Sequence, residues 1–476
     1  GDLTLRDAII VGLAQAVAGR LVDTDPAALV TGPVVTDSRL AAPGALFVAI
    51  RGERTDGHEH SDAAREAGAV LVLAERAVPG PHVLVEDSVA ALGELARAVL
   101  SRLREQGELS VVGLTGSVGK TTTKDVLAQV LARSGPTVAP RESFNNEIGL
   151  PLTVLAATRE TRYLVLEMGA SGPGHIDYLT RIAPLDVAVV LIVGRAHLGG
   201  FGSIEAVARA KGEIVAGLRG DGTAVLNDDD ARVAAMAQHA PGDVLRFGTS
   251  DRAQVRATDI ELDERARPAF TLETDVSGSR QRHRVQLPLH GAHQVSNALA
   301  VAGAALALGL DPGAVAHALG QTDRVSAHRM AVTTRPDGVV VVDDSYNANP
   351  DSMAAALRAV AAMPAGRRLA VLGEMLELGA DSDRAHEDAG RLAAELGLDI
   401  VIAPGPAGDP VERGALAADR PPGRFQVLRP ADVADAQELL DELLRDGDLV
   451  LVKGSNGSGV WRLADHLTAA DGDAAW

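Results

Sequence analysis

Short, continuous runs of Val, Ile and Leu, each followed by a helix-like stretch, constrain the fold of this chain more than any other feature. In the middle of the chain these runs are LSVVGLTG, RYLVLEMGA, DVAVVLIVG and GTAVLND. The stretches between them include KDVLAQVLARSG and SIEAVARAKGEIVAGL. Buried parallel strands have this composition because helices cover both of their faces. We therefore expect a doubly wound, mostly parallel sheet in residues 107–325.

Two smaller α/β units flank this region. The first hundred or so residues combine turn clusters with a helix-like SDAAREAGA and a strand-like VLVLAE, and the polar stretch SRLREQGELS follows. Towards the C-terminus, GVVVVDDSY, RLAVLGEM, DIVIAPG and DLVLVKGS repeat the strand-then-helix pattern, which predicts a Rossmann-like unit. Alternation between about Arg252 and Pro288 predicts antiparallel strands added to the central sheet. The expected α/β domains are 1–106, 107–325 and 326–476.

The composition excludes several kinds of partner. Lys and Arg number 45 against 64 Asp and Glu, and the formal net charge of -19 repels nucleic acid and anionic lipid. The chain has no Cys, which excludes disulfides and thiolate metal sites. No apolar run approaches a membrane-spanning length, and the first residues lack the basic flank of a signal peptide. We expect a cytoplasmic protein that binds small molecules, with no nucleic-acid partner and no membrane insertion.

The stretch TGSVGKTTTKD, between a predicted strand and a predicted helix, has the features of a phosphate-binding loop. Backbone N–H groups and a helix N-terminus favour an anion, and glycine permits its close approach. Lys120 would reach the outer phosphates of a nucleotide, and the Thr121 hydroxyl would hold Mg²⁺. The strict pattern GxxxxGK[ST] is not met, because Leu114 occupies the position of the first Gly. An ordinary Gly-containing turn is the alternative, but the flanking elements favour nucleotide binding.

Three further polar residues of the central domain lie at or after the ends of its predicted strands. Glu167 lies at a strand C-terminus, where α/β sheets bind ligands, and could complete a Mg²⁺ shell; a helix-capping or solvated acid is an equal alternative. His197 follows another strand, and Lys211 lies on a helix for which Ser203 is the expected N-cap. Taken singly, the latter two are typical of a loop His and a solvated helical Lys.

These segments, in this order, resemble the Mur ligases, ATP-dependent enzymes that add amino acids or peptides to the peptidoglycan precursor. TGSVGKTTTKD resembles the family's phosphate loop, LEMGA its acidic metal strand, and AHLGGFGS and ARAKGEI its His and Lys segments. HQVSNALA resembles its adenine-side helix and DDSYNANPDS its carboxy-terminal hinge motif. The similarity extends over essentially the whole chain, and several segments in one order are far more specific than any single motif.

Within the family, SFNNEIGLPLTVL, LEMGASGPGHIDYL, DDSYNANPDSM and LGEMLELG are most similar to the ligases that join UDP-N-acetylmuramoyl-tripeptide to D-alanyl-D-alanine. The ligase one step earlier, which adds a diamino acid, is the rival, but its Asp-Asn-Pro-Arg motif does not occur here. TDSRLAAPGALFVAIRGERTDGH resembles the uridine-diphosphate-binding domain of both enzymes. A folylpolyglutamate-like ligase and a scaffold without chemistry are further alternatives; His197 together with Lys211 favours a catalyst.

The resemblance implies ATP, two Mg²⁺ ions and a carbamylated Lys211. The ATP phosphates would contact Thr115, Gly116, Ser117, Val118, Gly119, Lys120, Thr121 and Thr122. Thr121 and Glu167 would bind one Mg²⁺. His197 and the carbamate of Lys211 would serve the other, because carbamylation converts an amine into an anionic oxygen ligand.

The resemblance also implies the remaining binding residues. His293 and Asn297 would face the adenine, while Arg329 and Asp344 would reach the phosphate and ribose from the third domain. The expected substrate contacts are Ser38, Asn145, Asn146 and Asn347. Lys120, Lys211, His197 and Arg329 would be the catalytic residues. The expected partners are small molecules, UDP-N-acetylmuramoyl-tripeptide and D-alanyl-D-alanine, and a monomer is expected.

In the family reaction, a carboxylate attacks the γ-phosphate of ATP, and an amine then displaces phosphate from the acyl phosphate. Both steps gather negative charge, and the water-sensitive intermediate implies that domain closure precedes chemistry. The sequence departs from the family near the second metal, where Ile192 replaces a usual Asn and Gly200 a usual acid. Two other clusters are not expected to bind metal: NDDD, interpreted as a turn and helix cap, and DGHEH, whose His residues we expect to be solvated.

Overall fold

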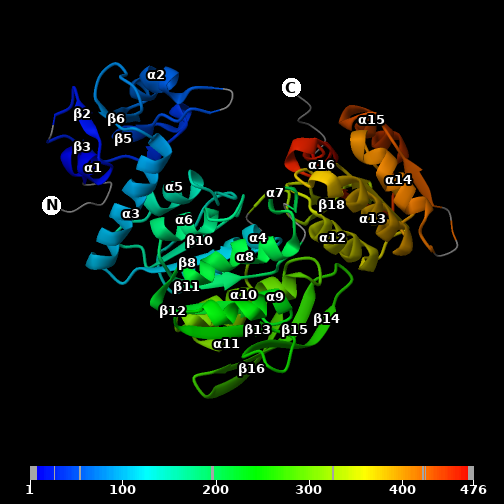
Figure 1. Ribbon diagram of the computed structural model, residues 1–476. Helices are drawn as coiled ribbons and strands as arrows, with labels where there is room; N and C mark the ends of the chain where they lie inside the picture. Colours follow the sequence, from blue (N-terminus) through cyan, green and yellow to red (C-terminus); the bar gives the residue numbers. More distant parts are fainter. Residues whose placement is uncertain are drawn as a thin grey trace.

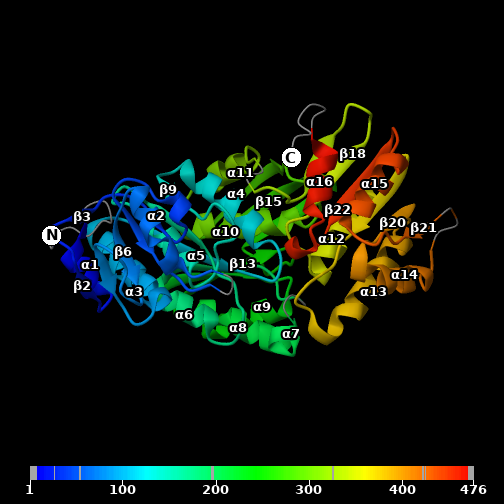
Figure 2. The same ribbon diagram turned by 90° about the horizontal axis from the view of Figure 1, so that it is seen from above.

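The computed structural model describes residues 8–25, 27–52, 55–194, 198–323, 326–420, 423 and 425–469. They form three α/β domains, with the central domain at the base of an open V and the other two as its arms (Figure 1). Seen from above, the domains follow one another in chain order (Figure 2). The predicted three-domain α/β architecture is confirmed. The boundaries at residues 106 and 325 stay predictions.

The N-terminal domain is built on a five-stranded sheet of order β2-β7-β6-β5-β4. The strands are β2 (Arg20–Val22), β4 (Val34–Val35), β5 (Ala45–Val48), β6 (Ala69–Ala74) and β7 (His82–Leu84). All neighbours are parallel except β2 and β7. The remaining elements are β1 (Ala8–Ile9), α1 (Ile10–Ala16), β3 (Leu29–Val30), α2 (Ser61–Glu66) and two short 3₁₀ helices, Ser38–Leu40 and Gly57–His60.

The expectation that both His residues of DGHEH are solvated is wrong for His58. Its side chain is buried, with Nδ1 donating to Asp56 Oδ1 at 2.6 Å and Nε2 accepting the Glu75 N–H at 2.9 Å. The hydrogen bond from His58 holds the pKa of the Asp56 carboxyl well below its usual range. His58 is therefore a structural residue that joins the loop to the end of β6.

The central domain carries a nine-stranded sheet of order β16-β15-β14-β13-β12-β11-β8-β10-β9. Its strands are β8 (Ser110–Thr115), β9 (Thr137–Val138), β10 (Tyr163–Glu167), β11 (Leu185–Val190), β12 (Leu218–Asn227), β13 (Asp243–Gly248), β14 (Val255–Leu262), β15 (Pro268–Val276) and β16 (Ser279–Gln286). The neighbours from β9 to β14 are parallel, and β14, β15 and β16 are antiparallel, as predicted. The chain places β10 on one side of β8 and β11 on the other, so the strand order reverses at β8.

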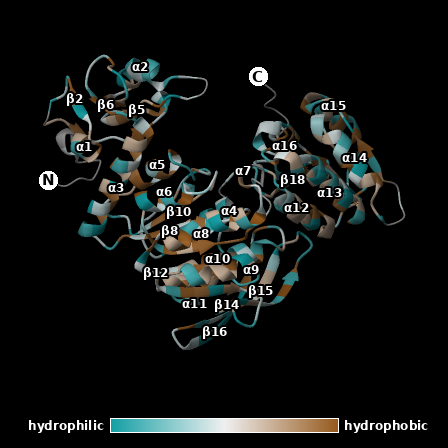
Figure 3. Cartoon of the chain, in the orientation of Figure 1, coloured by the Kyte–Doolittle hydropathy of each residue, from teal (hydrophilic) through white to brown (hydrophobic). Residues whose placement is uncertain are grey.

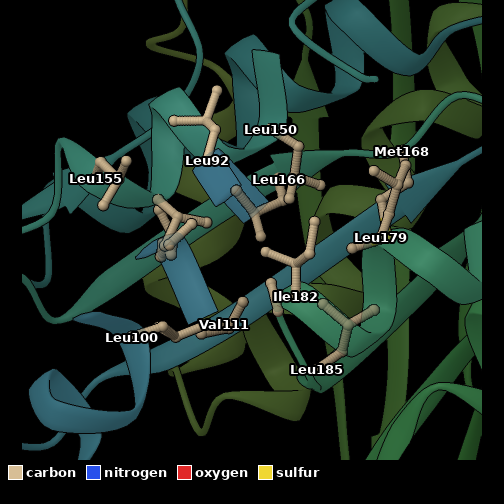
Figure 4. Close-up of a cluster of buried hydrophobic side chains, with 14 of the residues drawn as sticks. Leu92, Leu100, Val111, Leu150, Leu155, Leu166, Met168, Leu179, Ile182 and Leu185 are labelled. Atoms are coloured by element: carbon tan, nitrogen blue, oxygen red, sulfur yellow. The ribbon is translucent and has the colours of Figure 1, made fainter. Parts of the chain in front are cut away.

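Alternate residues of these strands bury two apolar clusters on opposite faces of the sheet. Val111 and Leu166 point towards α3 (Ser88–Gln106), α5 (Gly149–Leu155) and α6 (His175–Ile182), as Figure 4 shows. Val112 and Leu114 lie in the cluster on the other face, with α4 (Lys120–Ala132), α10 (Gln294–Ala307) and α11 (Pro312–Leu319). Figure 3 shows hydrophobic residues along the strands and the helices that cover them. The sheet is doubly wound, as predicted.

Three further α-helices belong to the central domain: α7 (Leu198–Phe201), α8 (Ile204–Ala216) and α9 (Ala231–Ala235). Asp230 caps α9 by accepting the N–H groups of Arg232 and Val233, so the interpretation of NDDD as a turn and helix cap is confirmed. No helix in the described part of the chain is long and apolar enough to cross a membrane.

The C-terminal domain has a six-stranded sheet of order β17-β18-β22-β19-β20-β21, parallel except for β17 at its edge. The strands are β17 (Ala331–Thr334), β18 (Val340–Asp344), β19 (Arg367–Leu372), β20 (Ile400–Ile402), β21 (Gln426–Leu428) and β22 (Asp448–Lys453). One face packs on α12 (Pro350–Ala362), α13 (Ser382–Glu395) and α14 (Gly408–Leu416), and the other on α15 (Val433–Leu443) and α16 (Trp461–Thr468).

Candidate functional site

A cavity of about 320 Å³ lies where the central and C-terminal domains meet. It adjoins the carboxyl ends of β8 and β10, at the point where the strand order reverses and open α/β sheets bind their ligands. The predicted residues that line it are Ser117, Val118, Gly119, Lys120, Thr121, Thr122, Asn145, Asn146, Glu167, Lys211, His293, Asn297, Arg329, Asp344 and Asn347. Thr115 and Gly116 are buried beneath it at the end of β8, and His197 lies outside the described residues.

The loop between β8 and α4 depends on glycine. Gly119 has φ 86°, and a Cβ there would lie 2.5 Å from Asn297 Oδ1, so any other residue would be strained and would clash. The next residue begins α4, and its side chain turns back so that Lys120 Nζ donates to Gly116 O at 2.8 Å. Burial lowers the pKa of Lys120; the Glu167 carboxylate opposes this effect and Arg329 adds to it.

Oxygen atoms of three residues converge behind this loop. Thr121 Oγ1 lies 3.2 Å and 3.4 Å from the two Glu167 carboxylate oxygens, and 2.7 Å from Ser143 Oγ. Asn145 Nδ2 donates to Glu167 Oε1 at 3.1 Å. Glu167 is 1% exposed at the end of β10, so the solvated-acid alternative is wrong. A hydroxyl beside a buried carboxylate has the hard oxygen donors that Mg²⁺ prefers.

The described residues hold no group of three His, Cys, Asp or Glu side chains arranged for a metal ion. A Mg²⁺ ion in a phosphate site commonly uses only one or two protein carboxylates, the rest of its shell being phosphate and water oxygens. Thr121 and Glu167 therefore suffice as the protein's share of one such shell.

Lys211 lies on α8, which Ser203 caps by accepting the Ala206 N–H as predicted. Its side chain is 2% exposed and lines the cavity, so the alternative of a solvated helical Lys is wrong. Burial first, and the charge of Lys120 second, hold the pKa of Lys211 well below its usual value. The amine is thus driven towards its neutral, nucleophilic form.

Arg329 reaches the phosphate loop from the start of the C-terminal domain. Its Nη2 donates to Thr121 Oγ1 at 3.2 Å and to Ser143 Oγ at 3.3 Å, and its guanidinium lies 4.2 Å from the centre of the Tyr346 ring. The flanking residues, His328 and Met330, both have positive φ angles, 56° and 47°. Such conformations cost about 1–2 kcal/mol per residue, and clusters of strained residues are typical of functional sites.

The end of β18 carries a charged pair at the cavity wall. Asp344 Oδ2 accepts from Lys453 Nζ at 2.6 Å, and its Oδ1 accepts the Met330 N–H at 3.0 Å. On the facing helix α10, Asn297 Nδ2 donates to Gln294 Oε1 at 3.0 Å. Burial lowers the pKa of His293, opposed by Asp344, so the imidazole is favoured in its neutral form.

The chain is similar to known proteins along most of its length. Family models match the chain as the Mur ligase middle domain over residues 114–305, the Mur ligase glutamate ligase domain over residues 328–456, and the Mur ligase family catalytic domain over residues 33–99. The UDP-N-acetylmuramoyl-tripeptide--D-alanyl-D-alanine ligase of Mycobacterium leprae is 43% identical over 98% of this chain and 99% of that protein. The chain belongs to the Mur ligase family.

Two solved structures are similar to this Mur ligase over nearly its whole length. MurF from Acinetobacter baumannii has a TM-score of 0.85 at 32% identity and covers 96% of this chain and 97% of its own. MurF ligase from Thermotoga maritima, solved in complex with ADP, has a TM-score of 0.76 at 31% identity and covers 92% and 97%. The family resemblance inferred from the motifs is confirmed.

Several residues of this Mur ligase site were not predicted: Ser143, Tyr346, Asn349 and Lys453. Asn349 caps α12 and also donates Nδ2 to Ser117 O of the phosphate loop at 3.1 Å. The sequence Asn-Pro-Asp-Ser carries an N-cap signal for this residue, and Lys453 is a charge at the end of an apolar strand. Those two signals were available from the sequence.

The predicted substrate residue Ser38 and the two positions that depart from the family, Ile192 and Gly200, do not line the cavity. Ser38 is half-buried in the 3₁₀ helix of the N-terminal domain and does not line it. Ile192 has a 39% exposed side chain, and its backbone oxygen accepts the Ser117 N–H at 2.8 Å. Gly200 is exposed on α7.

Proposed function

We propose that this Mur ligase uses ATP to join UDP-N-acetylmuramoyl-tripeptide to D-alanyl-D-alanine, giving the UDP-pentapeptide, ADP and phosphate. One observation carries the proposal: a phosphate loop, a buried Lys and an Arg from another domain line a single cavity. The name of the M. leprae relative, and of relatives at 44% identity, supports the choice of substrates. The earlier, diamino-acid-adding ligase is the alternative.

ATP binds with its phosphates against residues 115–122. The T. maritima relative, solved with ADP, supports this assignment. Lys120 and Arg329 approach from two domains, and both carry charge suited to the phosphoryl oxygens. His293 and Asn297 face the adenine, and Asp344 reaches the ribose. Because Arg329 belongs to the C-terminal domain, the site is complete only when that domain is closed against the loop.

Two bound Mg²⁺ ions would supply positive charge near the transferred phosphoryl group. Thr121 and Glu167 would supply hard oxygen ligands for one ion. His197 and a carbamylated Lys211 would hold the second. Burial lowers the pKa of Lys211, which supports carbamylation, since only a neutral amine adds to carbon dioxide. An NMR carbamate signal from ¹³C-labelled carbon dioxide, absent in Lys211→Met, is the expected result.

The chain's own residues then direct the chemistry. The tripeptide carboxylate attacks the γ-phosphate, and Lys120 and Arg329 stabilise the charge on its oxygens. The dipeptide amine attacks the acyl phosphate, and phosphate leaves. Asn145, Asn146 and Asn347 contact the substrates at the cavity, and Ser38 contacts the uridine diphosphate on the N-terminal domain. The enzyme acts as a monomer in the cytoplasm.

The deciding experiment measures ADP release with Mg²⁺ and ATP, adding UDP-tripeptide and D-alanyl-D-alanine separately and then together, with mass analysis of the product. Turnover only with both, and a UDP-pentapeptide, is expected. Amide formation from the UDP-dipeptide and a diamino acid would instead identify the earlier ligase. Tight ATP binding without turnover would identify a scaffold.

A further inference from the structure

The wall of the ligand cavity that follows β10 carries a hydroxyl, an imidazole and a carboxylate in series. Ser171 and His175 both line the cavity, and Ser171 Oγ lies 3.0 Å from His175 Nδ1. On the other side of the ring, His175 Nε2 lies 2.9 Å from Glu147 Oε2, just before α5. None of these three side chains has a role in the proposed function. Both distances lie in the range over which protons pass between side chains, about 2.6–3.2 Å.

The hydrogen bonds of His175 determine its tautomer. The Ser171 N–H donates to His175 Nδ1 at 3.1 Å, so this nitrogen is an acceptor and carries no proton. Nε2 therefore carries the ring proton and donates it to the Glu147 carboxylate. A neutral imidazole that a carboxylate orients, with its unprotonated nitrogen against a hydroxyl, is the arrangement of a general base.

Carboxylates surround the first turn of α6, which begins at His175. Besides Glu147, Glu213 of α8 reaches this turn and accepts the Asp177 N–H at 2.9 Å. Asp177 itself pairs with Arg181 on the same helix at 2.7 Å. The negative charge of Glu147 and Glu213 stabilises an imidazolium at His175, so uptake of a proton by the ring is favoured.

Ser171 lies where the central and C-terminal domains meet. A Cβ on Gly200 would lie 3.5 Å from Ser171 O, so Ser171 is next to α7. Helix α7 contacts the 3₁₀ helix Gly379–Asp381 of the C-terminal domain. Helix α8, which carries Lys211, packs against α6. Ser171 and Lys211 thus line one wall of the cavity, the wall that holds the second metal site in the proposed function.

We propose that Ser171, His175 and Glu147 form a proton relay that takes a proton from the incoming amine in the second step. This inference rests on the proposed function. Ser171 Oγ, at the cavity surface, contacts the amine nitrogen, and His175 is the base behind it. The relay is needed because an ammonium group has no lone pair with which to attack the acyl carbon.

The protons and electrons of this step balance. An N–H bond of the ammonium breaks and its proton forms a new bond to Ser171 Oγ, while the original hydroxyl proton of Ser171 moves to His175 Nδ1. The freed lone pair of the amine forms the bond to the acyl carbon. The bond from that carbon to the phosphate oxygen breaks, and phosphate leaves with the electron pair and one further amine proton. His175 then donates through Nδ1 to Ser171 Oγ and through Nε2 to Glu147.

His293 is the other imidazole that lines the cavity, among the described residues. It lies at the start of α10, on the adenine side in the proposed function. Its Nε2 lies 3.2 Å from the Gln294 amide nitrogen. His175 is therefore the imidazole placed for the second step.

The test compares His175→Asn and Ser171→Ala with the control His317→Asn, at an exposed position on α11. The Asn amide oxygen can still accept the Ser171 N–H, but it cannot take up a proton. We expect kcat to fall roughly 100-fold in both relay variants, the scale of general-base catalysis, with KM for ATP and UDP-tripeptide unchanged. The double variant should lose no more than either single one, because the relay acts as a unit. The control should keep its kcat.

The pH profile separates a proton acceptor from a structural residue. The unaltered enzyme should lose kcat at acid pH, where the relay already holds its proton, and His175→Asn should lack this acidic limb. Hydroxylamine is largely unprotonated at neutral pH, so it should still trap the acyl phosphate in His175→Asn as a hydroxamate. A profile of unchanged shape in His175→Asn overturns the inference, whatever the melting temperature of the variant.

A further measurement separates this inference from the proposed function. Positional isotope exchange in ATP with UDP-tripeptide alone reports the first step, and it should persist in His175→Asn. If the unaltered enzyme shows neither exchange nor turnover, the proposed function fails. If the unaltered enzyme turns over and His175→Asn is as fast, or loses the exchange together with turnover, the relay assignment is overturned.

Discussion

The joint between the N-terminal and central domains is a large apolar cluster, whereas the joint between the central and C-terminal domains has several hydrogen bonds and a small apolar contact at Ala266. At the first joint, Leu92 and Leu100 of α3 are buried in one cluster that runs from the strands of the N-terminal domain to β8 and β10 (Figure 4). At the second joint, Asn349 donates to Ser117 O and Ser326 Oγ donates to Asp125 Oδ2 at 2.5 Å. Helix α3 thus packs in the cores of two domains at once. The hydrogen bonds at the second joint can instead be broken one by one.

This difference indicates which domain moves. Separating the apolar joint would expose a large continuous apolar surface, at a cost of about 25 cal/mol per Å². Each hydrogen bond of the polar joint can be exchanged for one with water, at a net cost of about 0.5–1.5 kcal/mol. We therefore expect the N-terminal domain to stay fixed on the central domain, and the C-terminal domain to open and close over the ligand cavity.

The largest effect is expected at the polar joint. Arg329→Ala removes a cation that crosses from the C-terminal domain to Thr121 and Ser143, so kcat should fall roughly 10³-fold, about 4 kcal/mol, as for other arginines that act on phosphoryl groups. The melting temperature should change little, because the lost hydrogen bonds can be exchanged for hydrogen bonds to water. Steady-state kinetics and calorimetry check both expectations.

The control for Arg329→Ala is Arg335→Ala, on the same domain, where the Arg side chain pairs with Asp337 at the surface. It should leave kcat unchanged within a factor of two or so. It should also change stability little, since exposed ion pairs contribute about 0–1 kcal/mol to the free energy of unfolding. A large loss of stability in Arg329→Ala would contradict the picture of a joint that serves chemistry rather than folding.

At the apolar joint the opposite result is expected. Leu92→Ala leaves a cavity in the shared cluster and should lower the free energy of unfolding by about 2–5 kcal/mol. All KM values should stay unchanged below the melting temperature. Urea unfolding measures the effect, with Arg102→Ala on the exposed side of the same helix as the control, expected to change it by less than about 0.5 kcal/mol. If the N-terminal domain unfolds separately in Leu92→Ala, the two domains are not one cooperative unit.

The pH dependence of stability should distinguish the ligand cavity from the apolar joint. Lys211 has a native pKa below its unfolded value, so the unfolded chain binds more protons and stability rises with pH towards 10.5. The slope is at most about 1.4 kcal/mol per pH unit for this group. Lys211→Met should reduce the slope, leaving the contribution of Lys120, which has the same sign.

Urea unfolding at several alkaline pH values, in chelator and without carbon dioxide, measures this slope. Leu92→Ala should shift the whole curve downward with its slope unchanged, because no titrating group is involved. Equal slopes in the unaltered protein and in Lys211→Met would show that Lys211 is charged in the native state.

The sequence predicted the parts of the site that depend on local structure. Lys120 and Glu167 each end or follow an apolar strand, and the carboxyl ends of neighbouring parallel strands meet at one edge of a sheet. The contacts between domains were not predictable in this way. Asn349 and Ser117 are 232 residues apart and lie in different domains, so their contact depends on how whole domains pack. His58 was misjudged because a polar loop pattern does not tell which side chain turns inward.

The smallest effect is expected from a single side chain beside the polar joint. Gln129 on α4 donates to Asp323 O at 2.7 Å and accepts the Asp323 N–H at 2.8 Å, just before the C-terminal domain begins. Gln129→Ala should lower the free energy of unfolding by about 1 kcal/mol, because the N–H and C=O groups of Asp323 can form hydrogen bonds with water instead. With the connection loosened, KM for ATP should rise two- to fivefold or so, since about 1 kcal/mol corresponds to that factor. Gln321→Ala, an exposed neighbour, should change neither value. An effect on KM as large as that of Arg329→Ala on kcat would mean that the connection itself, rather than the contacts across the cavity, decides closure.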